Sequence, residues 1–361
     1  MNIPVNFYRL FTALIFLTGC TASNKEKGGV HERSGKYLKE IADRHPSMGL
    51  VLVQVKDDSV FTYVTGKASK ETGVPVSRNT LFEIGSVTKL FTAILAQKYV
   101  NRKLIGWNDN IAGSIPDVSF SINDSTTLKH LVSHTAGFPA LPAFFTDSAP
   151  PVTNPYALVT EEKMVRYLSS FNDKQPPSFD NYNYSNFGMG LLGYMLEKRT
   201  GKNFEKLVSE EIAGPLGMNG TSITVTDSAA LAIGYDKNGV ATPYWGLGQI
   251  PGSGGLRSSA KDMAVFLKAC LPGGALDSIV QPMLQPLGKS PEGAICYGWQ
   301  KTAIEGTGDV YWHVGGTGGF RSYLGINPSK RTGVVVLTNQ VIDGIDEIGK
   351  KFMIITSGNP R

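Results

Sequence analysis

The chain has 361 residues, of which 41% are hydrophobic and 18% are charged, and its formal net charge is +5. This balance excludes a disordered chain and one that lies in a membrane throughout, and the length allows one or two domains. The charges are scattered, and the one basic cluster, Lys350 and Lys351, is too short to indicate nucleic acid binding.

The N-terminus predicts an export signal. Arg9 precedes an apolar run over residues 10–17, which is too short to span a bilayer of about 30 Å as a helix. The run ends in Leu-Thr-Gly-Cys and resembles a bacterial lipobox, so we expect a signal peptide over residues 1–19, lipidation of Cys20 and a tether over residues 20–30. The alternative is an ordinary signal peptide with an incidental cysteine. Thr21 stands where Asp often marks inner-membrane retention, which favours the outer membrane on its periplasmic side.

Residues 36–45 carry a helical pattern that ends before Pro46. Two strand-like runs follow, residues 49–56 and 59–65, and the Lys-Asp-Asp turn between them predicts a hairpin. Residues 82–85 form a short approach to the next helix, which we expect over residues 86–101.

Helices and long loops dominate the middle of the chain, and strands return near its end. We expect helices over residues 186–200, 204–212 and 345–355, a loop-rich stretch over 139–183, and strands over 311–314, 323–327 and 332–339.

This order predicts a sheet domain built from both ends of the chain, residues 31–85 and 246–361, with a mostly helical domain over residues 86–245 inserted between them. The fold class is therefore α/β plus all-α. Clefts form where such parts meet, so we expect the active site there.

The first candidate motif is Ser86-Val87-Thr88-Lys89. Residues three apart share a helix face, so the Lys89 amine would lie beside the Ser86 hydroxyl and could take its proton. Burial favours the neutral amine, and a serine at a helix start has a backbone N–H free to bind an oxyanion. Alone, the motif is equally typical of a helix-capping serine beside a solvated lysine.

Two further motifs lie far along the chain. Tyr184-Ser185-Asn186 offers a phenol that can relay a proton if nearby cations lower its pKa, and an amide that can hold both a lysine and a substrate. Residues 312–320, Trp-His-Val-Gly-Gly-Thr-Gly-Gly-Phe, end a strand whose glycines allow a ligand to approach the backbone. Alone, these patterns suit a packed tyrosine and a glycine-rich hairpin.

Together, and in this order, the three motifs resemble those of the class C β-lactamase and penicillin-binding protein family. Residues 127–138, 215–218 and 254–263 are similar to other recurring segments of that family, and the resemblance spans about residues 50 to 340. It implies a β-lactamase/transpeptidase-like fold, an antiparallel sheet flanked by terminal helices with a helical insertion.

The resemblance also implies site residues. Ser86 would form an acyl-enzyme, Lys89 and Tyr184 would move protons, and the backbone N–H groups of Ser86 and Gly316 would form the oxyanion hole. Substrate would be bound by the remaining residues of the motifs, Asn186, His313, Gly315, Gly316 and Thr317.

His313 stands where the family usually has lysine, as in some DD-peptidases and esterases that carry His-x-Gly. With an ordinary pKa of about 6.5 it would be partly charged at neutral pH, so binding of a substrate carboxylate would be weaker or pH-dependent. We expect His313 to hydrogen-bond Tyr184 and the substrate.

The resemblance leaves the substrate open. We expect β-lactamase-type hydrolysis of β-lactam amides; the alternatives are a DD-carboxypeptidase or endopeptidase acting on peptidoglycan peptides, a carboxylesterase, and a non-catalytic penicillin-binding sensor. We expect a monomer.

No cysteine and histidine spacing indicates a metal, and we expect no cofactor. Cys270 and Cys296 predict two buried thiols, with a single disulfide as the alternative. His130 and His134, four residues apart, are better explained as capping or packing a helix end than as catalytic bases.

Overall fold

The computed structural model describes residues 24–115, 125–146, 154–171 and 177–358. Cys20 and the signal peptide expected before it lie outside these ranges. The expected tether over residues 20–30 is described only from Asn24, where helix α1 begins, so this helix starts well before the predicted residue 36.

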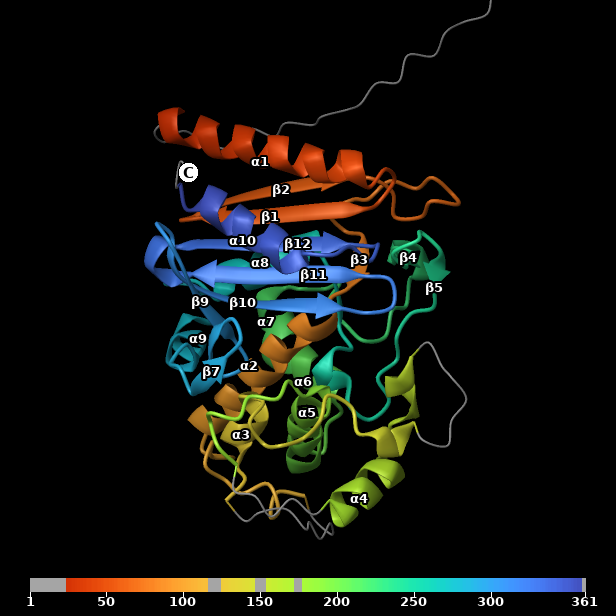
Figure 1. Ribbon diagram of the computed structural model, residues 1–361, viewed down its shortest axis with the longest axis vertical. Helices are drawn as coiled ribbons and strands as arrows, with labels where there is room; N and C mark the ends of the chain where they lie inside the picture. Colours follow the sequence, from red (N-terminus) through yellow and green to blue (C-terminus); the bar gives the residue numbers. More distant parts are fainter. Residues whose placement is uncertain (1–23, 116–124, 147–153, 172–176, 359–361) are drawn as a thin grey trace, which may run out of the picture.

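An eight-stranded antiparallel sheet is built from both ends of the chain, as predicted (Figure 1). Its strands, in spatial order, are β2 (Ser59–Thr65), β1 (Leu50–Lys56), β12 (Thr332–Thr338), β11 (Arg321–Asn327), β10 (Gly308–Gly316), β9 (Gln300–Ile304), β8 (Gly293–Ile295) and β7 (Gly288–Ser290). The predicted hairpin of β1 and β2 is confirmed, with Lys56 opposite Ser59. The short strands β7 to β9 were not predicted.

One face of the sheet is covered by the two terminal helices, α1 (Asn24–Arg44) and α10 (Ile345–Thr356). Alternation along β1 sends Leu50 and Leu52 to this face, where they join Phe352 and Met353 of α10 in one apolar cluster. Figure 1 shows α10 in front of the strands. The predicted flanking of the sheet by terminal helices is thus confirmed.

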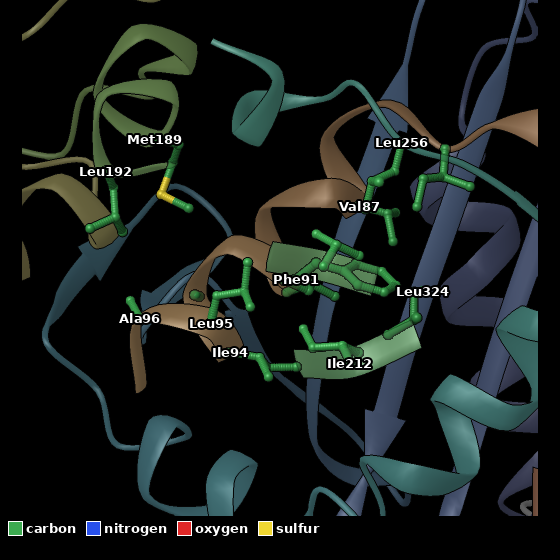
Figure 2. Close-up of a cluster of buried hydrophobic side chains, with 14 of the residues drawn as sticks. Val87, Phe91, Ile94, Leu95, Ala96, Met189, Leu192, Ile212, Leu256 and Leu324 are labelled. Atoms are coloured by element: carbon green, nitrogen blue, oxygen red, sulfur yellow. The ribbon is translucent and has the colours of Figure 1, made fainter. Parts of the chain in front are cut away.

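The opposite face packs on α8 (Ala260–Ala269) and on the helical part of the chain. Here Val51, Val53 and Leu324 join the larger apolar cluster. The central helix of that cluster is α2 (Thr88–Asn101), which is buried on nearly every side rather than on the single face that its sequence suggested. Figure 2 shows its side chains between those of α5 (Asn186–Thr200) and Leu324 of β11.

The remaining elements surround this core. They are α3 (Leu128–Val132), α4 (Glu161–Ser170), α6 (Phe204–Val208), α7 (Gly214–Leu216), α9 (Asp277–Met283), and the two-stranded pairs of β3 (Leu81–Glu83) with β6 (Arg257–Ser259) and β4 (Gly234–Tyr235) with β5 (Ala241–Thr242).

The helix predicted over residues 204–212 changes character after Val208. The backbone widens into a π-helical turn over Ser209–Ala213. Pro215 explains this, because its ring would clash with the carbonyl four residues earlier, that of Glu211. The displaced Glu211 carbonyl instead accepts a hydrogen bond from the Lys98 amine of α2.

Candidate active site

Ser86 lies on a 3₁₀ turn, Gly85–Val87, between β3 and α2. Gly85 has a φ of +48°, and a Cβ there would lie 2.6 Å from the backbone nitrogen of Gly316. Only glycine fits this conformation and this close approach. The turn therefore brings Ser86 against the end of β10.

The Lys89 amine lies 2.9 Å from the Ser86 hydroxyl oxygen, so the predicted sharing of one helix face is confirmed. The amine also lies 2.6 Å from the Asn186 side-chain oxygen and 2.6 Å from the Ser253 carbonyl oxygen. The side chain is fully buried, and that burial lowers the pKa of the amine well below its usual value.

In its neutral form, which burial favours, Lys89 can act on Ser86 as a base. The oxygens of Asn186 and Ser253 can only accept hydrogen bonds, so a neutral amine gives its two hydrogens to them. Its lone pair is then left facing the Ser86 hydroxyl. The arrangement can take the proton from Ser86 as that oxygen attacks a carbonyl carbon.

Tyr184 lies beside Ser86 and Lys89. Its ring centre lies 5.0 Å from the Lys89 amine. Burial raises the pKa of the phenol above its ordinary value, against the opposing effect of a hydrogen bond with Ser86. The condition that the sequence set for a relay through a lowered pKa is not met, because desolvation is the largest effect on this phenol. Tyr184 is therefore a neutral phenol, suited to giving a proton rather than to acting as a phenolate.

Asn186 opens helix α5, which Ser185 caps by accepting a hydrogen bond from the Gly188 N–H. The Asn186 amide nitrogen donates a hydrogen bond of 2.7 Å to the hydroxyl oxygen of Tyr156. Tyr156 was not singled out from the sequence.

The glycines of β10 bring the strand close to the 3₁₀ turn that carries Ser86. A Cβ at Gly315 would lie 2.1 Å from the Ile84 carbonyl oxygen, to which the Ser322 hydroxyl donates a hydrogen bond of 2.7 Å. Gly316 and Thr317 follow, and both line the same pocket as Ser86. The structure thus brings all three sequence motifs together.

His313 differs from the expectation. It is buried, and desolvation lowers its pKa to about 3, an effect to which Lys89 adds when it is protonated, so His313 is neutral at physiological pH rather than partly charged. Its Nδ1 lies 2.7 Å from the Val314 carbonyl oxygen, and its Nε2 has no partner among the described residues. Its ring centre lies 6.2 Å from that of Tyr184, and no hydrogen bond joins the two.

A pocket opens beside the Ser86 hydroxyl. Of the predicted site residues, Ser86, Asn186, Gly316 and Thr317 line it, and Lys89, Tyr184, His313 and Gly315 do not. The other lining residues are Gly85, Gly254 and four that the sequence did not single out, Tyr156, Trp245, Leu247 and Ser253. They come from segments between helices, where neither periodicity nor a motif marks them. Only the aromatic pair in Pro243-Tyr244-Trp245-Gly246, set among turn residues, offered a signal.

His130, His134 and the two described cysteines have contacts that explain them as structural residues. The Thr127 N–H donates to Nδ1 of His130 in a capping box at the start of α3, as expected. His134 accepts a hydrogen bond from the Ser185 N–H and packs on Tyr184. Cys270 and Cys296 are buried free thiols, which confirms the first of the two expectations for them.

Within the described ranges, no group of three His, Cys, Asp or Glu side chains is placed to hold a metal ion. No helix in those ranges is both long and apolar enough to cross a membrane.

The chain is similar to known proteins along most of its length. The sequence profile of the β-lactamase family matches residues 36–351. A β-lactamase from Pseudomonas fluorescens is 25% identical over 348 residues, covering 86% of this chain and 93% of that protein.

Two solved structures share the fold. A β-lactamase/D-alanine carboxypeptidase from Yersinia pestis has a TM-score of 0.79 at 22% identity, covering 92% of this chain and 99% of that one. A D-alanine carboxypeptidase from Burkholderia cenocepacia has a TM-score of 0.78 at 21% identity, covering 92% and 99%. The family match over most of the chain makes the conclusion plain: this protein belongs to the β-lactamase family and is a serine hydrolase with the β-lactamase/transpeptidase fold.

Proposed function

We propose that this hydrolase opens β-lactam amides through an acyl-enzyme on Ser86. The observation that carries the proposal is the buried Lys89 amine, 2.9 Å from the Ser86 hydroxyl oxygen and held by two further oxygens that can only accept. Such an amine is built to take a proton from one hydroxyl.

In the acylation step the Ser86 oxygen bonds to the β-lactam carbonyl carbon, and its proton passes to Lys89. The negative carbonyl oxygen is stabilised by the backbone N–H groups of Ser86 and Gly316, both at the pocket. The C–N bond then breaks, and the nitrogen takes a proton from Tyr184, whose raised pKa keeps it protonated. Tyr184 recovers its proton from Lys89.

In the second step a water molecule attacks the ester carbonyl carbon. Its proton passes to the same Lys89 and Tyr184 pair, and the Ser86 oxygen leaves with a proton. The relatives named as β-lactamases support hydrolysis of β-lactams, and those named as D-alanine carboxypeptidases support wall peptides as the alternative substrate.

Ester hydrolysis is a further candidate, and His313 favours it. A neutral imidazole at this position offers no positive charge to the carboxylate that β-lactams and wall peptides carry. An ester without a carboxylate does not need a positive charge at this position, so it binds as well beside histidine as beside lysine.

The test compares three substrates: a chromogenic cephalosporin, a peptide ending in D-Ala-D-Ala, and p-nitrophenyl butyrate. Wild type, Ser86→Ala and a control at an exposed serine, Ser169→Ala, are assayed side by side. Turnover of the cephalosporin that is absent only in Ser86→Ala supports the proposal. Faster turnover of the peptide or the ester assigns the alternative. A covalent mass increase on Ser86 without turnover of any substrate identifies a penicillin-binding sensor.

We also propose that Cys20 carries a lipid anchor at the cell envelope. Helix α1, the first described element, packs on the sheet face opposite the face that meets the helical part. Incorporation of a labelled fatty acid by wild type, and its loss in Cys20→Ala, would support this; equal labelling of the two proteins would overturn it.

A further inference from the structure

His134 has an uncommon backbone conformation. Its φ is +59°, in the left-handed region that favours glycine and that asparagine tolerates best among the other residues. The residue follows helix α3 and is only 2% exposed. A buried residue that is kept in an unfavourable conformation calls for an explanation from its contacts.

The segment that begins at His134 runs beside the residues on either side of Tyr184. The Asn183 N–H donates to the His134 carbonyl oxygen at 2.8 Å. The Ser185 hydroxyl donates to the Pro139 carbonyl oxygen at 2.7 Å. Tyr184 is therefore held through both of its neighbours by the chain that follows α3.

The imidazole of His134 adds contacts of its own. Its Nδ1 accepts a hydrogen bond of 3.1 Å from the Ser185 N–H, and its ring centre lies 4.5 Å from that of Tyr184. The Tyr182 ring meets the same imidazole at an interplanar angle of 83°, with ring centres 5.8 Å apart. One side chain thus contacts Tyr184 and the backbone of the residue that follows it.

These contacts show that His134 is not a base. The Ser185 N–H can only donate, so Nδ1 is occupied as an acceptor and the hydrogen of the neutral ring lies on Nε2. Burial lowers the pKa of this imidazole well below its ordinary value, which keeps the ring neutral. Neither nitrogen is then free to take a proton from Ser86.

Stability does not explain the residue either. The Nε2–H is buried and has no partner among the described residues, which is unfavourable, as is the left-handed φ. A residue that only packed the end of α3 would need neither feature. What histidine supplies here is a ring against Tyr184 together with an acceptor for the Ser185 N–H.

We propose that His134 is a positioning residue, whose imidazole fixes the Tyr184 phenol beside Lys89 and Ser86. The proposal rests on the proposed function, because it concerns the phenol that gives a proton to the leaving nitrogen. That phenol must stay within reach while protons move between its neighbours. A misplacement of about 1 Å can lower a rate about 10²-fold.

The test uses two substitutions of His134 that suit a left-handed backbone. Asparagine removes the ring and keeps an acceptor oxygen close to the position of Nδ1, and glycine removes both. The matched control is His130→Asn, which removes a buried imidazole four residues earlier that packs on Phe179 instead of Tyr184. Circular dichroism checks that each variant is folded.

The measurement is the first-order rate of Ser86 acylation at saturating substrate. Of the cephalosporin, the peptide and the butyrate ester, the one that acylates wild type fastest is used. Absorbance follows the reaction, or mass for the peptide. A first-order rate does not depend on how much of the protein is folded, so a merely structural role would leave it unchanged.

We expect His134→Asn to lower this rate about tenfold and His134→Gly about a hundredfold, because the second also frees the Ser185 N–H. The substrate concentration at half the limiting rate should stay within about twofold, since His134 does not line the pocket. His130→Asn should leave the rate within about twofold.

A wild-type rate in His134→Asn would overturn this inference and leave the proposed function standing, and so would equal decreases in His134→Asn and His130→Asn. If His134→Gly does not fold, the asparagine variant decides alone. If none of the three substrates acylates Ser86 in wild type, the proposed function fails and this inference fails with it.

Discussion

The Lys89 amine and the Ser253 carbonyl oxygen lie 2.6 Å apart, although 164 positions separate the two residues along the chain. The acceptor is a backbone oxygen, so a substitution of the Ser253 side chain leaves this acceptor in place for the amine. Substitutions of Lys89 itself therefore test whether this amine accepts the Ser86 proton.

Replacing Lys89 by Met or by Arg should lower the acylation rate by about 10²–10⁴-fold, the usual contribution of a positioned general base. Met has no proton acceptor of sufficient basicity, and Arg stays protonated at any working pH. Stopped-flow acylation by the chromogenic cephalosporin measures the rate. Lys261→Met, an exposed lysine on α8, is the control, and an Arg variant with wild-type acylation would contradict the role.

Replacing Gly315 by Ala should weaken both stability and acylation. The added Cβ would lie 2.1 Å from the Ile84 carbonyl oxygen and 2.3 Å from the Ser322 hydroxyl oxygen, so β10 must move away from the turn that carries Ser86. Overpacking of this kind costs about 1–3 kcal/mol. Urea unfolding and acylation rates measure the two effects. At Gly113, which has open space around it, alanine should change neither.

Replacing Arg257 by Met should destabilise the fold around Trp245. The Arg257 guanidinium lies 3.1 Å from the Glu83 carboxylate, and their side chains are only 12% and 4% exposed. Glu83 also accepts the Trp245 N–H at 2.8 Å. Removing one partner leaves a buried carboxylate uncompensated, at about 3–5 kcal/mol.

Urea unfolding of Arg257→Met checks this value. The control is Arg166→Met, which breaks an ion pair whose side chains are 64% and 79% exposed and should cost less than about 1 kcal/mol. An equal decrease in the free energy of unfolding in the two variants would show that burial does not determine the cost of breaking an ion pair.

Acid should destabilise the protein through His313 and His134, whose pKa values burial lowers, to about 3 for His313. Below about pH 6.5 the unfolded chain binds protons that the folded chain does not, so the free energy of unfolding decreases as the pH is lowered. For His313 this fall continues to about pH 3, at about 1.4 kcal/mol per pH unit.

Chemical unfolding of wild type and His313→Gln at several pH values between 4 and 7 measures this slope. The variant should show a shallower slope by about that amount. His45→Gln, at a partly exposed histidine, should change it far less. A wild-type slope in His313→Gln would mean that the imidazole is charged in the folded protein.

The sequence predicted those elements whose own pattern is strong. Two strand-like runs joined by a Lys-Asp-Asp turn marked the hairpin of β1 and β2, and long apolar runs marked α5 and β12. The strands β7 and β8 have three residues each, too few for any period, and they exist because β9 pairs with β8 and β8 with β7. Such pairing is a property of the folded chain.

The residues of the candidate site also divide into those that a local pattern predicts and those that only the folded chain brings together. The spacing of Ser86 and Lys89 is local, and the sequence predicted their contact. Ser253 and Tyr156 reach the site through loops distant in the chain, and no local pattern announces them. The neutral state of His313 follows from its burial, which a residue type alone does not reveal.

The hydrogen bond from the Ser322 hydroxyl to the Ile84 carbonyl oxygen joins the sheet to the segment that leads into the turn of Ser86. Undocking of the helical part from the sheet would separate the hydroxyl of residue 86 from the backbone N–H of Gly316 on β10, while each part kept its own backbone hydrogen bonds. During mild denaturation, catalysis should therefore fail before circular dichroism registers a loss of helix.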